Sequence, residues 1–190
     1  AFGDTAYDAP YSHPATTQTI YDLASISKLF TMSAVLIAAR ENQISIEESL
    51  AKFLPDFHGS DKRDITIRHL LNHTSGIEIA VQSLINEPCE SWTKLIAAAP
   101  LGAATGHRVL YSCTNYFLLA RLVELWTQQK LGDFIAQRIF EPLSFSRTGF
   151  FPLRNFAPDQ IAPTEILQGD EPLIGVVHDE AARAWENEQG

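Results

Sequence analysis

A long apolar segment with helical periodicity does most to limit what this chain can fold into. Apolar residues recur at spacings of three and four between Ser25 and about Asn42, which is the period of one helical face. The residues at this spacing are Leu29, Met32, Leu36 and Ala39. Apolar side chains also fill much of the other side: Ala34, Val35 and Ile37. A helix that is apolar on most sides packs inside a protein, so we expect this helix to be buried nearly all round.

The rest of the chain is also patterned mainly as helix. Helical spacing predicts short helices over residues 46–53, 66–71 and 91–99 and longer ones over 114–129 and 132–140. Asp64 or Thr66 is the expected cap of the second of these helices. Strand signals are few and lie mostly at the two ends of the chain. We therefore expect a mostly helical α+β fold in one domain over 1–190, with a lead-in over 1–24, a helical region over 25–150 and a loop-rich tail over 151–190.

The charge and composition of the chain exclude several classes of function. With a formal net charge of -9 and 14 lysines and arginines that form no cluster, the chain is a poor match for nucleic acid or an anionic membrane surface. The longest apolar run, residues 32–39, is too short to span a bilayer. The two cysteines and six histidines show no metal-ligand spacing. We therefore expect no metal, no cofactor, no nucleic-acid partner and no membrane span.

Ser25 and Lys28 form a Ser-x-x-Lys pair at the start of the apolar helix. Residues three apart on a helix share one face, so the lysine side chain can reach the serine hydroxyl. A neutral lysine in that position can take the hydroxyl proton and make the serine a nucleophile. Such a role requires a lowered lysine pKa, which burial and a neighbouring positive or hydrogen-bonding group would provide. The alternative is an ordinary serine cap followed by a solvated lysine.

Tyr111 is a second candidate for a chemical role. It lies with Ser112 and Cys113 on a predicted loop, between a glycine-containing turn at residues 102–106 and the helix over 114–129. A tyrosine on such a loop can relay a proton between a nucleophile and a leaving group. The alternative is a tyrosine that closes the hydrophobic core beside Phe117.

Five segments, in the same order along the chain, resemble the serine β-lactamase and penicillin-binding-protein superfamily. The resemblance is greatest to the class C-like branch, which includes esterases and D-alanyl-D-alanine carboxypeptidases. The segments are residues 22–28, similar to the nucleophile motif; residues 69–77, similar to the signature HLLTHTSGL; Tyr111-Ser112-Cys113, in place of Tyr-x-Asn; residues 140–150, similar to F-x-P-L-G-M-x-x-T; and residues 177–182.

The resemblance implies a role for each site residue. Ser25 would be the acylated nucleophile, Lys28 its base partner, and Tyr111 would share the proton transfers. Cys113 stands where the family has an asparagine that hydrogen-bonds the substrate amide and the lysine, and a thiol is only a weak donor and acceptor. The segment over residues 69–76 is expected to be structural.

The resemblance also implies that part of the family fold is absent from this chain. No Lys-Thr-Gly or His-x-Gly triplet, the third motif of the family, follows Tyr111. In the family, the strands at and after this motif supply one oxyanion-hole N–H and much of an antiparallel sheet. The chain therefore looks like a truncated β-lactamase/transpeptidase-like domain with an incomplete antiparallel sheet. Losing one oxyanion-hole donor lowers the rate of a hydrolase by roughly a hundred- to a thousandfold.

Two functions follow as expectations. The first is a serine hydrolase that forms an acyl-enzyme with an ester, a D-Ala-D-Ala-type peptide or a β-lactam. The second is a catalytically impaired homologue that binds a peptide-like ligand or serves as an interaction module. Because a missing sheet exposes apolar surface, we also expect self-association or a partner chain that completes the sheet.

Overall fold

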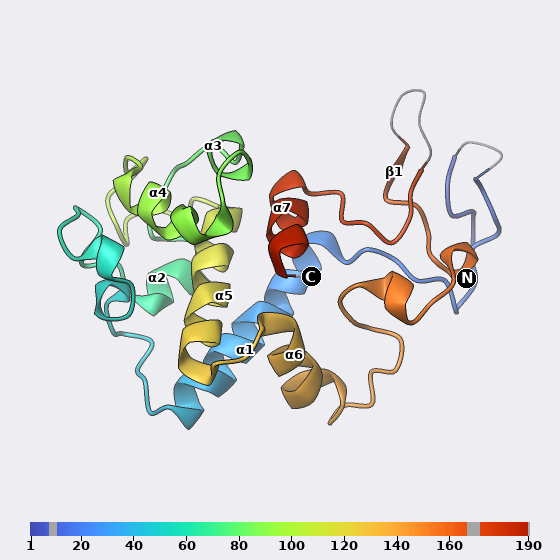
Figure 1. Cartoon of the computed structure of the whole chain (residues 1–190), viewed down its shortest axis with the longest axis horizontal. Coiled ribbons are helices and arrows are strands. Elements are labelled where there is room, and N and C mark those ends of the chain that lie inside the picture. Colours follow the sequence, from blue (N-terminus) through green and yellow to red (C-terminus); the bar gives the residue numbers. More distant parts are fainter. Residues whose placement is uncertain (8–10, 167–171, 190) are drawn as a thin grey trace. The chain divides into compact units, whose positions relative to one another are not determined.

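The chain divides into two compact units, with boundaries after Ser27 and after Ile139. The structure, a computed structural model, describes residues 1–7, 11–166 and 172–189 (Figure 1). One compact unit, called here the helical unit, consists of Lys28–Ile139. The other, the terminal unit, combines Ala1–Ser27 with Phe140–Gly190. The expectation of a single domain over the whole chain stays a prediction.

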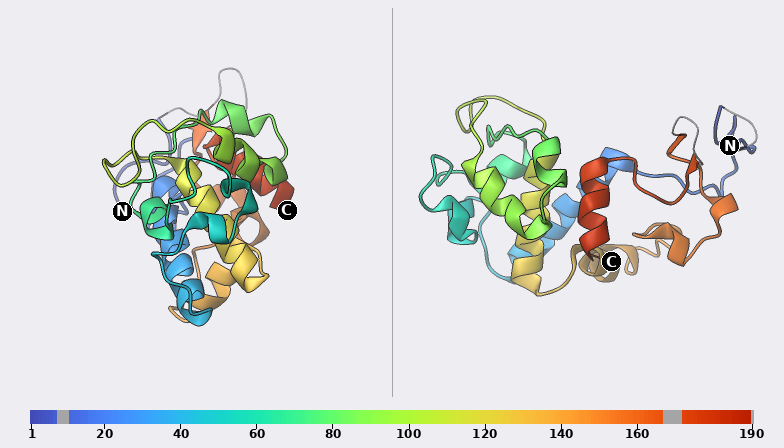
Figure 2. Two further views of the ribbon diagram at one scale, coloured as in Figure 1. Left: turned by 90° about the vertical axis from the view of Figure 1, so that its left-hand side faces the viewer. Right: turned by 45° about the horizontal axis from the view of Figure 1, so that its top comes forward.

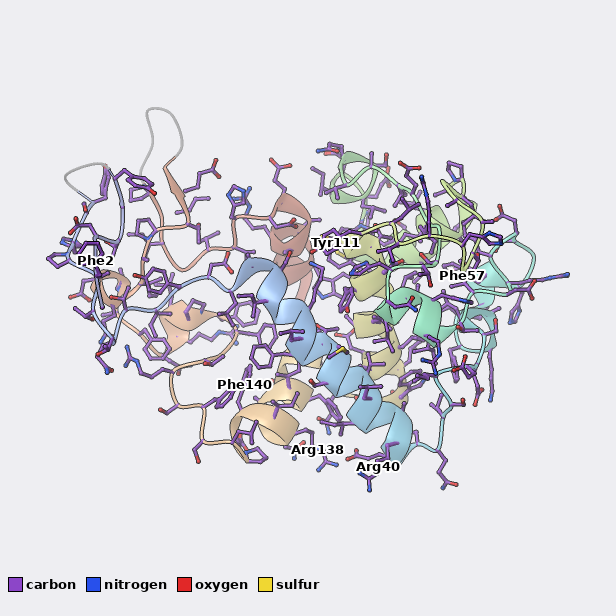
Figure 3. All side chains as sticks on the ribbon, turned by 180° about the vertical axis from the view of Figure 1, so that it is seen from behind. Phe2, Arg40, Phe57, Tyr111, Arg138 and Phe140 are labelled. Atoms are coloured by element: carbon purple, nitrogen blue, oxygen red, sulfur yellow. The ribbon has the colours of Figure 1, made fainter. Side chains whose placement is uncertain are left out.

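Helix α1 (Ser27–Glu41) runs obliquely past α5 (Cys113–Thr127) in the helical unit, as Figures 1 and 3 show from opposite sides. Its buried residues are mostly small: Ala34, Val35, Ala38 and Ala39. The expectation of burial nearly all round is wrong, because Leu29 is 57% and Leu36 is 44% exposed. These two leucines are seven residues apart, which places them on one face of the helix.

The helical unit also contains α2 (Ile67–Leu71), α3 (Gln82–Ile85), α4 (Trp92–Ala98) and α6 (Leu131–Ile135), which continues into a π-helical turn, η5 (Ala136–Phe140). Helices α2 and α6 pack against α5. Buried apolar residues of α5 supply much of the core: Leu118, Leu119, Leu122 and Val123. The buried ring of Trp92 meets the ring of Phe117 edge-on, with 5.1 Å between their centres.

Most of the expected helices of this unit are confirmed. The segments over 66–71, 91–99, 114–129 and 132–140 correspond to α2, α4, α5 and α6 with η5. Thr66, and not Asp64, caps α2, because its side chain accepts the N–H of His69. The helix expected over 46–53 is wrong: the chain there forms the 3-10 turn η2 (Leu50–Lys52), with η3 (Pro55–Phe57) after it. An antiparallel bridge between Ser49 and Thr66 holds the backbone extended just before η2.

The terminal unit has short elements joined by irregular segments. Strands β1 (Glu165–Ile166) and β2 (Pro172–Leu173) pair antiparallel, with Glu165 opposite Leu173. Ile20 forms an isolated parallel bridge with Ile161. The sequence reading of the tail does not predict α7 (Glu180–Gln189), the helix that follows the strands (Figure 2). The 3-10 turns of this unit are η1 (Ala24–Ile26), η6 (Pro152–Arg154) and η7 (Pro158–Gln160).

The described residues form a mostly helical α+β fold, which confirms the predicted fold class. Their sheet has two strands. No helix in this part of the chain is both long enough and apolar enough to cross a membrane.

Candidate active site

Ser25 lies in η1, the turn that leads into α1 and belongs to the terminal unit. The Asp22 carboxylate accepts the Ala24 N–H at 2.9 Å, and the Ser27 hydroxyl donates to the Ala24 carbonyl at 2.6 Å. Ala24 has a φ of 46°, in the left-handed region that costs a non-glycine residue about 1 kcal/mol. Local backbone strain therefore immediately precedes the exposed Ser25, and Lys28 follows three residues later.

Lys28 is in the first turn of α1, and its half-buried side chain contacts two tyrosines. Its Nζ lies 5.2 Å from the centre of the Tyr111 ring and 5.8 Å from that of the Tyr116 ring. Interactions with the side chains of Tyr111 and Cys113 raise the pKa of its ammonium group. The structure therefore brings together three of the predicted site residues, while Ser25 is in the other unit and is linked to Lys28 through the chain.

These contacts set the protonation of Lys28. Burial by itself lowers the pKa of the ammonium group, but hydrogen bonds and charge interactions with Tyr111 and Cys113 outweigh burial and hold the pKa above its ordinary value. The expectation of a lowered lysine pKa is therefore wrong, because the neighbouring groups favour the charged form. At neutral pH Lys28 is an ammonium ion.

His73 holds the segment that carries Tyr111. Its carbonyl accepts the Leu110 N–H at 2.8 Å, and its Nδ1 accepts the Ser112 N–H at 3.2 Å. Its ring lies against the Tyr111 ring, with 4.6 Å between the ring centres and 36° between the planes. The backbone on either side of Tyr111 is thus hydrogen-bonded to one residue, which itself has a φ of 60°.

Two residues near the start of α5 join this helix to the end of α2 and to the segment after it. These residues are Asn115 and Tyr116. The buried Asn115 accepts the Ser75 hydroxyl at 2.7 Å through its Oδ1, and its Nδ2 lies 3.3 Å from the Nδ1 of His73. The Tyr116 hydroxyl donates to the Leu71 carbonyl at 3.1 Å. The helix that begins at Cys113 is therefore anchored on the segment that also holds Tyr111.

The sequence predicts a structural role for the segment over residues 69–76. This role fits His69 but does not describe His73. The His69 Nδ1 accepts a backbone N–H at 3.1 Å and so helps to cap α2. His73 instead contacts Tyr111, and sequence reasoning missed it together with Asn115 and Tyr116. A signal exists for Asn115, because an asparagine on the apolar side of a helix is buried only where it finds hydrogen-bond partners.

The pKa values of two groups near Lys28, His73 and Tyr116, are shifted in the direction of their neutral forms. Burial lowers the pKa of His73, and the Lys28 charge lowers it further. Burial also raises the pKa of Tyr116; the Lys28 charge opposes that shift, and the charge of Tyr111 adds to it. A neutral imidazole and a neutral phenol therefore flank the Lys28 ammonium.

The groups brought together in the helical unit are an ammonium, phenols, a thiol and an imidazole. Such groups suit proton transfer and the stabilisation of negative charge. Within residues 1–7, 11–166 and 172–189, no three His, Cys, Asp or Glu side chains gather in a way that could hold a metal ion.

Comparison with known proteins matches the chain to one family. The model of the beta-lactamase family matches residues 3–182. A putative D-alanyl-D-alanine carboxypeptidase from Escherichia coli (strain K12) is 33% identical over 180 residues, which cover 86% of this chain and 41% of that protein. One of the same name from Salmonella agona (strain SL483) is 31% identical over 207 residues, which cover 92% of this chain and 47% of that protein. The chain thus spans less than half the length of these relatives.

Solved structures share the fold. The octameric penicillin-binding protein homologue from Pyrococcus abyssi has a TM-score of 0.68 and 25% identity, over 91% of this chain and 45% of that one. The D-alanine carboxypeptidase AmpC from Burkholderia cenocepacia has a TM-score of 0.64 and 23% identity, over 79% of this chain and 40% of that one. The likeness to the second structure shows the fold alone.

Proposed function

The chain belongs to the beta-lactamase family, and we propose that it acts as a serine hydrolase through an acyl-enzyme intermediate on Ser25. One observation carries most of the support: the Nζ of Lys28, three residues after Ser25, lies 5.2 Å from the centre of the Tyr111 ring, and the side chains of Tyr111 and Cys113 raise its pKa. These positions lie in the segments that resemble the family's catalytic motifs. Because the chain spans less than half the length of its relatives, the activity, substrates and partners of the whole protein are part of the proposal.

In this proposal Tyr111 transfers protons and Lys28 supplies charge. A protonated lysine cannot take a proton, so the raised pKa of Lys28 supports Tyr111, in its phenolate form, as the acceptor of the Ser25 proton. The Lys28 ammonium stabilises the negative charge of that phenolate. The Ser25 Oγ forms a bond to the substrate carbonyl carbon, the bond to the leaving group breaks, and the leaving group takes the proton from Tyr111, which becomes a phenolate again. Water then gives a proton to the Tyr111 oxygen as it adds to the acyl carbon, the bond from that carbon to the Ser25 Oγ breaks, and Ser25 takes the proton from Tyr111 as the acid product leaves.

The substrate we propose is an ester, a D-Ala-D-Ala-type peptide or a β-lactam, each with an acyl carbon open to attack by a serine. The peptide has the most support, since the two relatives that are 31% and 33% identical are named putative D-alanyl-D-alanine carboxypeptidases. All three substrates share the same nucleophile and differ in their leaving groups.

Covalent labelling of the purified chain with a fluorescent penicillin, and in parallel with a fluorescent fluorophosphonate, tests the proposal. We expect Ser25→Ala to abolish labelling. Ser33→Ala is the matched control and should retain labelling, because the Ser33 hydroxyl donates to the Leu29 carbonyl at 2.8 Å within α1. Tyr111→Phe should slow labelling, because the phenol oxygen that accepts the proton is gone. A folded chain whose Ser25 takes neither probe would contradict the proposal.

A second candidate is a catalytically impaired homologue that binds a peptide-like ligand or another chain. One feature of the sequence favours it: Cys113 in place of the family's asparagine. Calorimetry with a D-Ala-D-Ala peptide separates the two functions. Binding without acylation supports the second function, and acylation of Ser25 contradicts it.

A further inference from the structure

His73 makes the contacts that fix where Tyr111 lies. It accepts the N–H of Leu110 through its carbonyl and the N–H of Ser112 through its Nδ1, so hydrogen bonds to one residue bracket Tyr111. Its ring also packs against the Tyr111 ring, 4.6 Å away between centres. The Tyr111 side chain is 59% exposed, so little core packing holds it, and these contacts with His73 and Lys28 take the place of that packing.

The hydrogen bond from Ser112 defines which form of His73 can do this. A ring nitrogen accepts a hydrogen bond only when it carries no proton, so the Nδ1 acceptor requires a neutral imidazole with its proton on Nε2. The Nδ2 of Asn115, 3.3 Å away, offers a second donor to the same nitrogen. A proton on Nδ1 would turn this nitrogen into a donor, which would repel both the Ser112 N–H and the Asn115 Nδ2.

The charged and titratable groups around His73 come from α1, from α5 and from the segment just before α5. Lys28 brings a positive charge from α1, while Tyr111 and Tyr116 present their rings at 4.6 Å and 5.2 Å. Burial lowers the pKa of His73, and the Lys28 charge lowers it further. The positive charge of Lys28 therefore opposes a second positive charge on a protonated His73.

We propose that His73 is a positioning residue whose neutral form holds Tyr111 in place, and that acid switches the site off by protonating this histidine. The effect on rate rests on the proposed function, whereas the effect on the position of Tyr111 does not. Folding favours the neutral imidazole. The stability that the folded chain gains from the neutral imidazole is therefore fully present above the ordinary histidine pKa of about 6.5. It is lost as the pH falls through the lower pKa that His73 has in the folded chain.

Nuclear magnetic resonance of the Ser25→Ala chain tests the positioning without relying on activity. At about pH 8 we expect the His73 imidazole to carry its proton on Nε2. On acidification, the Ser112 amide should shift with the same midpoint as His73. A proton on Nδ1 in the neutral ring, or a Ser112 amide that does not follow His73, overturns the proposal whether or not Ser25 can be acylated.

Two substitutions at His73 separate positioning from folding, with labelling by the fluorescent penicillin as the readout. Asparagine tolerates the φ of 60°, and its amide oxygen can accept the Ser112 N–H without titrating. His73→Asn should therefore label faster than His73→Ala at neutral pH and lose the fall in acid. His73→Ala lacks the acceptor and should slow labelling by up to about tenfold, the effect of losing one ordinary hydrogen bond.

The matched control is His107→Asn, at an exposed histidine in the turn that precedes the Tyr111 segment. It should leave both the labelling rate and its pH profile unchanged. A fall in acid that persists in His73→Asn assigns the effect to another group and overturns the proposal.

Discussion

Cys113, at the first position of α5, stands where the resemblance predicts an asparagine, and its side chain raises the pKa of Lys28. The thiol keeps a contact with the lysine. It has neither the carbonyl nor the amino group with which an amide side chain holds a substrate. At the scale of single residues, we therefore expect the cysteine to weaken substrate binding more than it changes the charge of Lys28.

Cys113→Asn is predicted to speed the acylation of Ser25. An added hydrogen bond to a substrate amide is worth roughly 1 kcal/mol, or about a fivefold increase in rate. The rate of labelling by a fluorescent penicillin measures the change. Cys89→Ala, at the buried cysteine of η4 (Cys89–Ser91), serves as the control and should leave the rate unaltered. An equal or lower rate in Cys113→Asn counts against the role of the missing amide.

At the scale of elements, one buried polar pair ties α5 to the segment after α2. Ser75 and Asn115 are both buried, and the Ser75 hydroxyl donates to the Asn115 Oδ1 at 2.7 Å. The same asparagine lies beside His73, so this link also sets the position of His73, which hydrogen-bonds the backbone on either side of Tyr111. The candidate site thus depends on how two helices far apart in the sequence are joined.

Asn115→Leu is predicted to lower the free energy of unfolding by about 1–3 kcal/mol, because the buried Ser75 hydroxyl loses its acceptor. Adding Ser75→Ala removes the hydroxyl that has lost its acceptor and should recover part of that loss, reduced by the cost at Ile77, whose N–H donates to the Ser75 hydroxyl at 3.2 Å. Urea unfolding of the two single variants and the double variant measures the coupling. Strictly additive losses would show that the hydrogen bond does not join the two segments.

Elements with a local start signal are among those that the sequence pattern predicts correctly. Thr66 caps α2 and Ser112 caps α5 with their own side chains, and both helices are where the periodicity places them. Residues 46–53 have helical spacing, yet pairing of Ser49 with Thr66 prevents a regular helix there. Such pairing joins residues distant along the chain, so the local pattern carries no sign of it.

At the scale of the whole molecule, α1 presents an apolar face. Leu29 and Leu36, on that face, are 57% and 44% exposed. We propose that copies of this chain associate through it, because covering apolar surface is favourable by about 25 cal/mol per Å². A partner chain that completes the sheet is the alternative occupant, and it would leave the isolated chain monomeric.

Leu36→Glu is predicted to shift the chain towards the monomer, because a charge placed on the face would have to be desolvated on association. Sedimentation velocity over a range of concentrations measures the shift. Leu143→Glu, at a leucine that is 60% exposed in the terminal unit, is the control and should associate like the unaltered chain. A monomer at every concentration, or equal shifts in both variants, would rule out this face as the contact.

Features that depend on short spacings and on the order of motifs could be predicted without a structure. The three-residue step from Ser25 to Lys28, the cap at Thr66 and the ordered segments lead to the helical elements and to the family whose model matches residues 3–182. Each of these features is local, because a cap or a helical face is made by residues a few positions apart.

The surroundings of Lys28 could not be predicted in this way, because they form when distant segments of the chain meet. The hydrogen bond from Ser112 to His73 joins residues 39 positions apart, and the contact between Asn115 and His73 spans 42. Pattern reading predicted a lowered lysine pKa, whereas the folded chain holds it above its ordinary value. The physical reason is that a pKa responds to the charges and hydrogen-bond partners within a few ångströms, and only the folded chain brings those groups to the lysine.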